Sequence, residues 1–419
     1  MGHVKDLKTG IKYKNTPIGK IPVDWEVVKL EDICQIIGGS TPSTTRKEYW
    51  GGDMPFVTPT DITNLKGKEI SDTEQKITLE GLSSCGTKLL PVGSILLTSR
   101  ATIGACAINT KPMATNQGFA NLVCNEKAFN WFIFYMMTLL KGELERLGSG
   151  STFKEVSKRN IRSLFLPLPP LSEQKRIAEI LTTVDEAIEK TDQIIEKTKE
   201  VKKGLMQKLL TRGIGHKKFK KTEIGEIPVE WEVGEISDYG EILTGNTPPT
   251  NVPQYYGNEY PFVSPFDLGN KRIIRKTEKY LSKEGFAVAR ALPANSVLVV
   301  CIGSTIGKTG IAGTELATNQ QINSIICKNS DYNFVYYYAT FINQEFKQIA
   351  GTQAVPILNK GNFRKVKVAI PPLSEQKEIG GKLSAINDEI EKESNHKEQL
   401  ELLKKGLMQV LLTGKIRVS

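Results

Sequence analysis

Apolar residues recur at intervals of three and four along two long stretches of the chain, each of which follows a double proline. The prolines Pro169-Pro170 and Pro371-Pro372 end the preceding segment, because proline cannot lie inside a helix. Gly213 and Gly414 suit the C-terminal ends of these stretches. The spacing predicts two long amphipathic helices whose apolar stripes pair as an antiparallel coiled coil. The stripe residues are Leu181, Val184, Ile188, Ile195, Leu205 and Leu209 in the first helix, and Leu383, Ile386, Ile390, Leu400, Leu407 and Leu411 in the second.

Polar residues occupy both ends and parts of the middle of these two helices. Ser172 and Ser374 are candidate N-caps, and Glu173 and Glu375 suit the positive end of the helix dipole. Polar residues that interrupt the stripe either fix the pairing register or mark places where the seam is loose. They are Thr191, Thr198 and Lys202 in the first helix, and Glu393, Lys397 and Lys404 in the second.

The segment before each long helix has the pattern of a mixed domain. Short β-type runs such as Ser94–Thr98 and Ser296–Val300 are separated by Gly, Pro, Asn and Asp. Phe129–Leu147 and its counterpart Phe334–Ala350 are each expected to form an amphipathic helix. The fold class predicted is α+β, with two mixed α/β domains separated by the two long helices.

The chain is an internal duplication. Ile18–Ile33 (IGKIPVDWEVVKLEDI) recurs as Ile224–Tyr239 (IGEIPVEWEVGEISDY), and PPLSEQK at Pro169–Lys175 recurs unchanged at Pro371–Lys377. The intervening motifs keep the same order in both halves, so one unit of about 200 residues is used twice, with pseudo-twofold symmetry expected. The predicted boundaries are 1–168 for the first domain, 169–213 for the first long helix, 214–370 for the second domain and 371–419 for the second long helix.

Composition narrows the class of protein. Of 419 residues, 39% are hydrophobic and 24% charged, which is typical of a soluble globular chain. The longest apolar stretch, Phe129–Leu140, is too short to span a membrane, and the N-terminus lacks the apolar core of a secretory signal, so a cytoplasmic location is expected. The six cysteines form no CxxC motif and are interpreted as reduced thiols, with disulfides as the alternative. The net charge of +10 suits a polyanion such as nucleic acid.

Sequence signatures of catalysis are absent. The three histidines lie in polar or lysine-rich surroundings, unlike a metal or Ser-His-Asp site. Gly303–Thr309 (GSTIGKT) has three residues between its first glycine and the GK, whereas a phosphate loop has four. We therefore expect a binding protein with two equivalent readers, and duplex DNA is the natural ligand.

The motifs together resemble a known family. The order WEV, GSTP or GNTP, PFV[TS]PxD, TIG, ATNQ and PPLSEQ at the head of a long helix is similar to that of the specificity subunits of type I restriction–modification enzymes. The resemblance implies that each domain is a target recognition domain reading one half of a bipartite asymmetric DNA site. It implies that the coiled coil sets the spacer and docks two methyltransferase subunits, which restriction subunits join. It also implies that S-adenosylmethionine, ATP and Mg belong to those partners, so that this chain is non-catalytic and holds no cofactor or metal.

Candidate DNA contacts lie in the turn-rich motifs. Arginine can contact guanine, and hydroxyls can contact bases or phosphates. The candidates are Thr41, Thr58, Thr60, Arg100, Thr102, Ser151 and Thr152 in the first half, and Thr247, Ser264, Ser304, Thr305, Lys308, Thr352 and Gln353 in the second. Motifs shared by two readers of different sequences more often shape the fold, so Asp61 and Asp267 are expected to cap turns, and Asn116 and Asn319 to be structural.

Base readers should instead differ between the halves. Aligning Thr102 with Thr305 sets Arg100 against Gly303, and Ala105 against Lys308, so Arg100 and Lys308 are the sharper candidates. The run 212–221 (RGIGHKKFKK) is either a phosphate contact or a solvated linker. Two other functions remain open: a protein-binding adaptor built around the coiled coil, and a DNA enzyme with an unrecognised centre.

Overall fold

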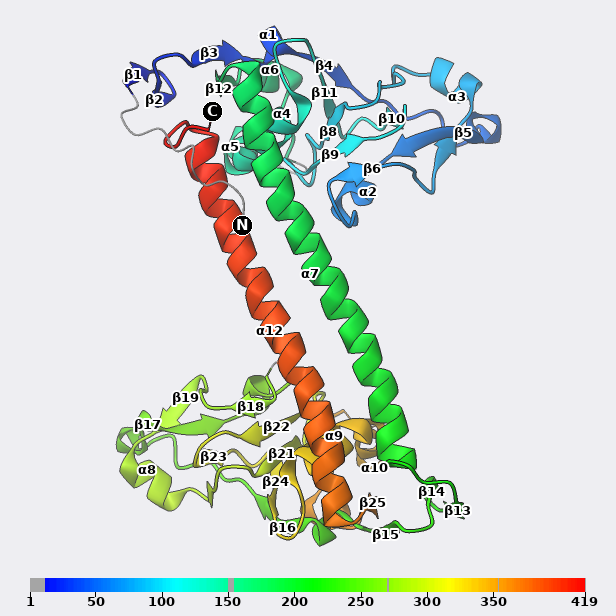
Figure 1. Ribbon diagram of the computed structural model, residues 1–419, viewed down its shortest axis with the longest axis vertical. Helices are drawn as coiled ribbons and strands as arrows, with labels where there is room; N and C mark the ends of the chain where they lie inside the picture. The colour runs from blue at the N-terminus through cyan, green and yellow to red at the C-terminus, as the bar shows by residue number, and fades with distance from the viewer. Residues whose placement is uncertain (1–11, 150–153, 270, 353, 419) are drawn as a thin grey trace. The chain divides into compact units, whose positions relative to one another are not determined.

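The computed structural model describes residues 12–149, 154–269, 271–352 and 354–418 (Figure 1). The chain forms two compact units. Unit 1 comprises residues 1–192 and 395–419, and unit 2 comprises residues 193–394. The units therefore divide inside the two long helices and not at the double prolines, so each unit holds a mixed α/β part together with one portion of each long helix.

Unit 1 contains two mixed sheets and two antiparallel ribbons. The larger sheet has the strand order β4-β11-β8-β9-β6 and the smaller β10-β5-β7, with β6/β9 and β10/β5 parallel. The larger sheet's strands are β4 (Cys34–Gly38), β6 (Glu69–Ile70), β8 (Ile95–Leu97), β9 (Cys106–Asn109) and β11 (Ala120–Cys124). The smaller sheet's strands are β5 (Trp50–Val57), β7 (Lys76–Ile77) and β10 (Ala114–Thr115). The ribbons pair β1 (Tyr13–Thr16) with β2 (Gly19–Pro22), and β3 (Glu26–Lys29) with β12 (Phe165–Leu168).

Unit 2 repeats this arrangement, as the duplication predicts. Its sheets have the orders β16-β24-β21-β22-β18 and β19-β17-β23-β20. The first sheet's strands are β16 (Gly240–Thr244), β18 (Ile273–Ile274), β21 (Val297–Val300), β22 (Thr309–Ala312) and β24 (Ile322–Cys327). The second sheet's strands are β17 (Tyr256–Val263), β19 (Lys279–Leu281), β20 (Ala291–Leu292) and β23 (Leu316–Thr318). The ribbons pair β13 (Phe219–Thr222) with β14 (Gly225–Pro228), and β15 (Glu232–Glu235) with β25 (Lys367–Ile370).

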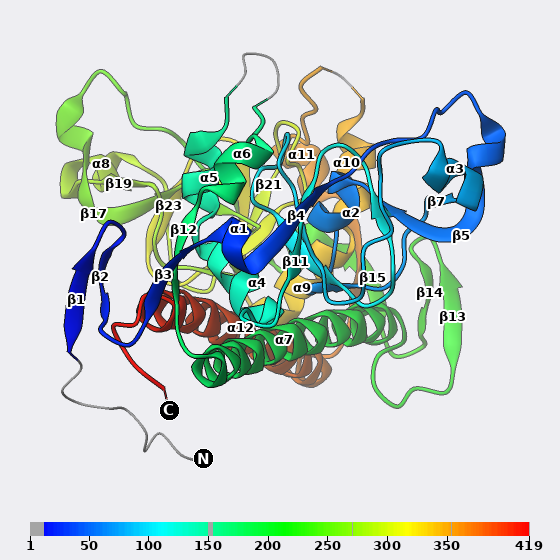
Figure 2. The ribbon, with the colours of Figure 1, turned by 90° about the horizontal axis from the view of Figure 1, so that it is seen from above.

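The ends of the long helices α7 (Leu171–Arg212) and α12 (Leu373–Leu411) are built into the hydrophobic cores of the units. In unit 1, Ile177 and Leu181 of α7 and Leu411 of α12 share one core with the sheet and with α4 (Asn130–Leu139). Figure 2 shows α4 between β11 and α7. In unit 2, the core includes Leu209 of α7, Leu383 of α12 and α9 (Tyr332–Phe341). Burial of these apolar stripes fixes the mixed α/β part of each unit onto the helices.

The short helices complete the two units. In unit 1 they are α1 (Leu30–Ile33), α2 (Pro59–Thr63), α3 (Leu79–Ser83), α5 (Lys141–Leu147) and α6 (Lys158–Arg162). In unit 2 they are α8 (Lys283–Val288), α10 (Asn343–Ala350) and α11 (Lys360–Arg364), with 3₁₀ turns at Ile236–Asp238, Pro253–Tyr255 and Pro265–Asp267. A further 3₁₀ turn covers Lys47–Tyr49.

Two kinds of local prediction need correction, and a third is confirmed. Phe129–Leu147 and Phe334–Ala350 are not single helices, because Leu140 and Ile342 leave the helical conformation and separate α4 from α5 and α9 from α10. Ser172 and Ser374 are not N-caps, because α7 and α12 already begin one residue earlier, at Leu171 and Leu373. The glycine ends are confirmed: Gly213 and Gly414 follow the helices with φ of +62° and +70°, a conformation that favours glycine.

The two long helices run antiparallel within each unit. In unit 1, Asp185 of α7 contacts Lys404 of α12, and Asp192 contacts Lys397. Seven residues forward along α7 therefore correspond to seven residues backward along α12, as in an antiparallel pair. In unit 2, Lys202 contacts Asn387. All of the predicted stripe residues are buried or half-buried.

Two simpler expectations concern cysteines and membranes. All six cysteines are free thiols, as predicted. In the part of the chain that the structure describes, no helix is both long and apolar enough to cross a membrane.

Candidate nucleic-acid interface

The shared motifs of unit 1 meet at one edge of its sheets. The Thr41 hydroxyl donates a hydrogen bond to Oε1 of Gln117 at 2.5 Å, which joins the Gly39–Thr41 loop to the turn after β10. Gly39 is required for this approach, because a side chain there would collide with the backbone carbonyls of Thr115 and Asn116. The ATNQ and GSTP motifs are therefore one spatial feature.

The third motif of this edge is a capped turn. The Asp61 carboxylate accepts hydrogen bonds from the backbone N–H of Thr58 at 2.7 Å and from its hydroxyl at 2.6 Å. The predicted capping role of Asp61 is confirmed, and the Thr58 hydroxyl is occupied by it. The Asn116 side chain accepts from the N–H of Gly118, which confirms its structural role. Of these side chains, Thr60 is the one that the turn exposes to solvent.

Unit 2 builds the same edge from its own copies of the motifs. Thr247 donates to Oε1 of Gln320 at 2.6 Å. Asp267 accepts from both the N–H and the hydroxyl of Ser264 at 2.8 Å, and Asn319 accepts from the N–H of Gln321. The structural roles predicted for Asp267 and Asn319 are thus confirmed. The scaffold of the edge is common to both units, so it carries no information that distinguishes two DNA sequences.

A second loop adjoins this edge in each unit. In unit 1, Ser99 N–H donates to the carbonyl of Gly118 and Ser99 carbonyl accepts from Val156, which places Arg100 and Thr102 next to the ATNQ turn. Arg100 is half-buried and Thr102 exposed. Ala101 has φ of +62°, a strained conformation for a residue with a side chain.

The equivalent loop of unit 2 corrects the sequence alignment. Cys301 donates to Gln321 as Ser99 does to Gly118, and Ile302 takes the bridge position that Arg100 occupies. Arg100 is therefore opposite Ile302, not Gly303, and unit 2 has one extra residue before Thr305. Gly303, with φ of +95°, takes the place of Ala101. Ser304 and Lys308 are exposed, and Thr305 is half-buried.

Some candidates lie outside these clusters or outside the described residues. Ser151, Thr152 and Gln353 fall among residues that the structure does not describe. Thr352 is exposed in the loop after α10. In the run 212–221, Arg212 pairs with Glu226 at 3.0 Å, and the run continues into β13, so part of it is ordered structure and not only a linker.

In each unit, a cluster of hydrogen bonds that we did not predict from the sequence joins the mixed α/β part to the N-terminal end of a long helix. We call this cluster the tether. In unit 1, the buried Glu173 carboxylate accepts from the indole N–H of Trp25 at 3.1 Å and from the guanidinium of Arg417 at 2.6 Å. Arg417 also forms two bonds with Asp24 at 2.7 Å. The hydrogen bonds that Arg417 donates to Glu173 and Asp24 raise the pKa of Arg417, so it remains charged.

Unit 2 has the same tether with a histidine as the third group. Glu375 accepts from the indole N–H of Trp231 at 2.9 Å, and Nε2 of His216 lies 2.9 Å from its other oxygen. Nδ1 of His216 lies 3.0 Å from Glu230. A sequence signal for the tether exists, because a tryptophan and the glutamate of the Ser-Glu-Gln motif recur in both halves. Only the structure shows that these two residues meet.

Glu173→Gln should lower the stability of unit 1 by about 2 kcal/mol, since hydrogen bonds to charged groups contribute about 1.5–3 kcal/mol. Glutamine keeps the size of the side chain but removes the charge that faces Arg417. Thermal unfolding would measure the change. Glu179→Gln is the matched control, because the Glu179 side chain is 66% exposed and pairs only with Arg176 in the same helix; equal effects of both substitutions would contradict a special role for the tether.

Comparison with known proteins decides the family. The model of the type I restriction modification DNA specificity domain matches residues 22–200 and again 228–402. The chain is 30% identical to the type I restriction enzyme MjaIX specificity subunit of Methanocaldococcus jannaschii, over 97% of each chain. It is 33% identical, again over 97% of each, to a second chain of that organism, described as the MjaX specificity subunit. The crystal structure of an S subunit from M. genitalium has the same fold, with a TM-score of 0.61 over 93% of this chain and 96% of the other at 12% identity.

The chain belongs to the family of type I restriction–modification specificity subunits. The two matches to the domain model correspond to the two halves of the duplication. The role of this specificity subunit is DNA sequence recognition within a restriction–modification system, and it is a non-catalytic component. Methyltransferase and restriction subunits and DNA are the partners that this family implies.

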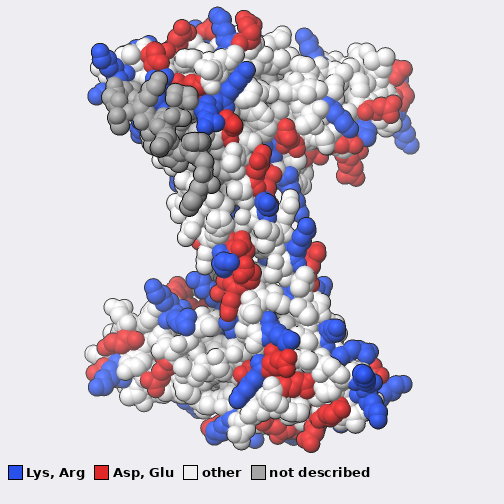
Figure 3. Space-filling model, in the orientation of Figure 1, with Lys and Arg blue, Asp and Glu red and all other residues white. Residues whose placement is uncertain are grey.

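Charges of both signs are interspersed over the face of the specificity subunit drawn in Figure 3. The excess of cations is therefore not gathered there into one basic field. Contacts to DNA would then depend on individual cations placed at the loops, such as the exposed Lys308.

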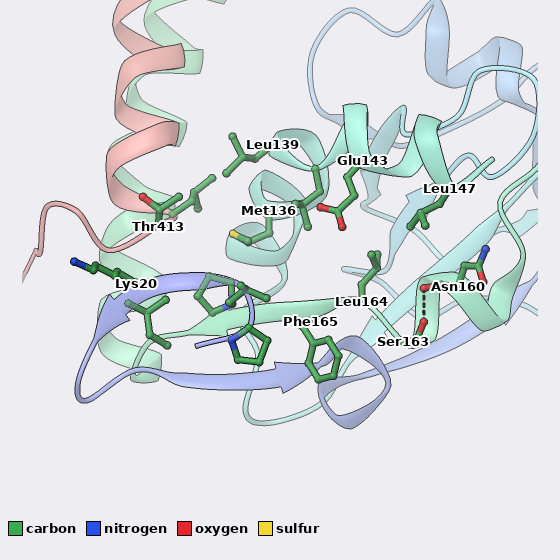
Figure 4. Close-up of a pocket in the computed structure, with 16 residues that line it drawn as sticks. Lys20, Met136, Leu139, Glu143, Leu147, Asn160, Ser163, Leu164, Phe165 and Thr413 are labelled. Carbon is green, nitrogen blue, oxygen red and sulfur yellow. Dashed lines mark hydrogen bonds between the residues drawn. The ribbon is translucent and has the colours of Figure 1, made fainter. Parts of the chain in front are cut away.

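A pocket of 470 Å³ lies in unit 1 of the specificity subunit (Figure 4). Met136, Leu139 and Leu147 line it from α4 and α5, and Phe165 from β12. Glu143 is its acidic residue and Lys20 its basic one. Among the described residues, none of the candidate DNA contacts lines this pocket.

Proposed function

We propose that each unit reads one half of a bipartite, asymmetric DNA site. The observation that carries this proposal is a shared edge that bears different side chains in the two units. The Thr41–Gln117 and Thr247–Gln320 contacts and the capped turns are common to both units. Arg100 is opposite Ile302, and Ala105 opposite Lys308. A common scaffold with different side chains suits two readers of different base sequences.

The long helices would form a continuous antiparallel coiled coil that sets the spacer between the half-sites and docks two methyltransferase subunits. The antiparallel contacts within each unit support this proposal. Restriction subunits would join the assembled complex. S-adenosylmethionine, ATP and Mg would be bound by the partner subunits, and this chain would hold none of them.

The test is a map of methylated adenines in a host free of other adenine methylation. Co-expression of the chain with its methyltransferase subunit should produce an interrupted, two-part motif, since each unit contacts its own half-site. The motif should be absent when either chain is expressed alone. A complex that assembles, binds DNA without sequence preference and produces no motif would contradict the proposal and favour a protein-binding adaptor.

An exchange of units tests whether each unit reads its own half of the DNA site. Replacing the unit 2 segment between the long helices with that of another specificity subunit should change one half of the motif and leave the other intact. A change in both halves would show that the units do not read DNA separately.

A further inference from the structure

Phe266 is an aromatic side chain that the fold turns outward. Its side chain is 76% exposed, the largest value among the large hydrophobic residues that the structure describes as exposed. It is the middle residue of the 3₁₀ turn Pro265–Asp267, directly after β17. An exposed ring of this size offers a large, flat apolar surface for contact with a ligand.

The turn that carries Phe266 is rigid. Asp267 accepts two hydrogen bonds from Ser264 on one side and a third, at 3.0 Å, from the N–H of Glu278 on the other. Leu268, the next residue along the chain, is fully buried. The ring is therefore held outward by structure on both sides, which lowers the entropy lost when a ligand binds.

The turn lies at the edge of unit 2 where Thr247 contacts Gln320, which we call the recognition edge. Strands β17 and β23 run parallel, with Val263 beside Thr318, and the N–H of Asn319 donates to the carbonyl of Val263 at 3.0 Å. The Phe266 turn and the turn holding Gln320 thus leave the same edge of one sheet.

Cations lie near the Phe266 turn. The side chain of Lys308 lies against Gly269, three residues after Phe266: a Cβ on that glycine would be 3.2 Å from Cδ of Lys308. The segment 271–279, which contains β18 and ends on the first residue of β19, carries four exposed cations, and Glu278 is the acidic residue among them. These cations are Lys271, Arg275, Lys276 and Lys279. An exposed aromatic ring on a turn with cations nearby suits a polyanion with apolar bases more than it suits an apolar protein surface.

Unit 1 lacks both features. Thr60 occupies the position of Phe266, and Glu69, Asp72 and Glu74 offset the lysines of the following segment. The two units therefore differ here, as readers of different half-sites should.

We propose that Phe266 is a specificity-determining residue that contacts a base edge in the half-site read by unit 2. The chemistry that fits is apolar contact with the 5-methyl group of a thymine in the major groove, while Lys308 and the cations after it contact the sugar–phosphate backbone. This proposal rests on the proposed function. Thr60 gives unit 1 a smaller contact, with a hydroxyl, at the equivalent place.

The test maps methylated motifs for Phe266→Ala and Phe266→Thr, each co-expressed with the methyltransferase subunit. One base position in the unit 2 half-site should relax, with preference for the original base falling about tenfold, while the unit 1 half-site stays unchanged. Val229→Ala is the matched control, because Val229 is an exposed apolar residue of unit 2, at 47%, beyond the recognition edge. Thermal unfolding should be the same for all three variants and the parent.

The outcomes separate the two proposals. Unchanged motifs and rates in both Phe266 variants would overturn the role of this residue and leave the proposed function intact. Failure of the parent complex to produce any two-part motif would overturn the proposed function itself. Loss of co-purification with the methyltransferase subunit in Phe266→Ala, but not in Val229→Ala, would show that the ring binds a protein and would also overturn the proposal.

Discussion

Replacing Asp185 with alanine should lower the free energy of unfolding of unit 1 by about 3–5 kcal/mol. The Asp185 side chain is 5% exposed and lies 2.6 Å from the ammonium group of Lys404, on the opposite helix. It also accepts a hydrogen bond from the Tyr135 hydroxyl at 2.8 Å. Burial raises the pKa of Tyr135, so that hydroxyl stays protonated as a donor. The Lys404 side chain is only 17% exposed. Without the Asp185 carboxylate, its ammonium group would lose its closest anion while it remains mostly buried.

Urea unfolding of the parent and of Asp185→Ala would measure this loss. Asp192→Ala is the matched control one heptad along the same helix. Its carboxylate also pairs with a lysine, Lys397, at 2.7 Å, but is 48% exposed, so its removal should cost less than about 1 kcal/mol. Similar losses in the two variants would show that burial does not decide the strength of these pairs.

Unit 2 contains a natural comparison for this pair. Asn387 stands where unit 1 has Asp185, and it contacts Lys202. Burial, together with the charge of Arg272, lowers the pKa of Lys202. The half-buried Lys202 thus faces a neutral amide oxygen, whereas Lys404 faces a carboxylate.

Lys308→Ala should weaken binding of the assembled complex to its own DNA site by about tenfold. Lys308 is exposed at the recognition edge, beside the rigid turn of residues 264–267. Unit 1 has Ala105 at this place, so the lysine is specific to one half-site. Titration of labelled duplexes at several salt concentrations would measure both the affinity and its salt slope.

The salt slope identifies the kind of contact. A phosphate contact would weaken binding to all duplexes and reduce the slope by about 1, whereas a base contact would weaken binding only to duplexes with the original unit 2 half-site. Lys328→Ala is the matched control. Lys328 follows the far end of β24, pairs with Glu241 at 3.0 Å, and should be replaceable without loss of affinity. Equal losses of affinity in both variants would show that Lys308 acts only through the net charge of the chain.

Periodic and repeated features were predicted correctly because they depend on residues close together in the sequence. The 3–4 spacing predicted α7 and α12, and Gly213 and Gly414 marked their ends. The capping roles of Asp61 and Asp267 were also predictable, since each carboxylate caps a residue three positions earlier. In contrast, Leu140 and Ile342 gave no sequence signal of the breaks that separate α4 from α5 and α9 from α10.

The sequence by itself thus determined the duplication, the long helices, the shared turn motifs and the family. Only the tertiary structure decided which distant groups meet. It joined Trp25 and Arg417 to Glu173, and it set Arg100 against Ile302 by revealing an inserted residue. It also showed that Thr58 and Ser264 are occupied by capping, while Phe266 is exposed. The physical reason is that periodicity and capping act over a few residues, whereas burial and pairing between distant segments depend on how the whole chain packs.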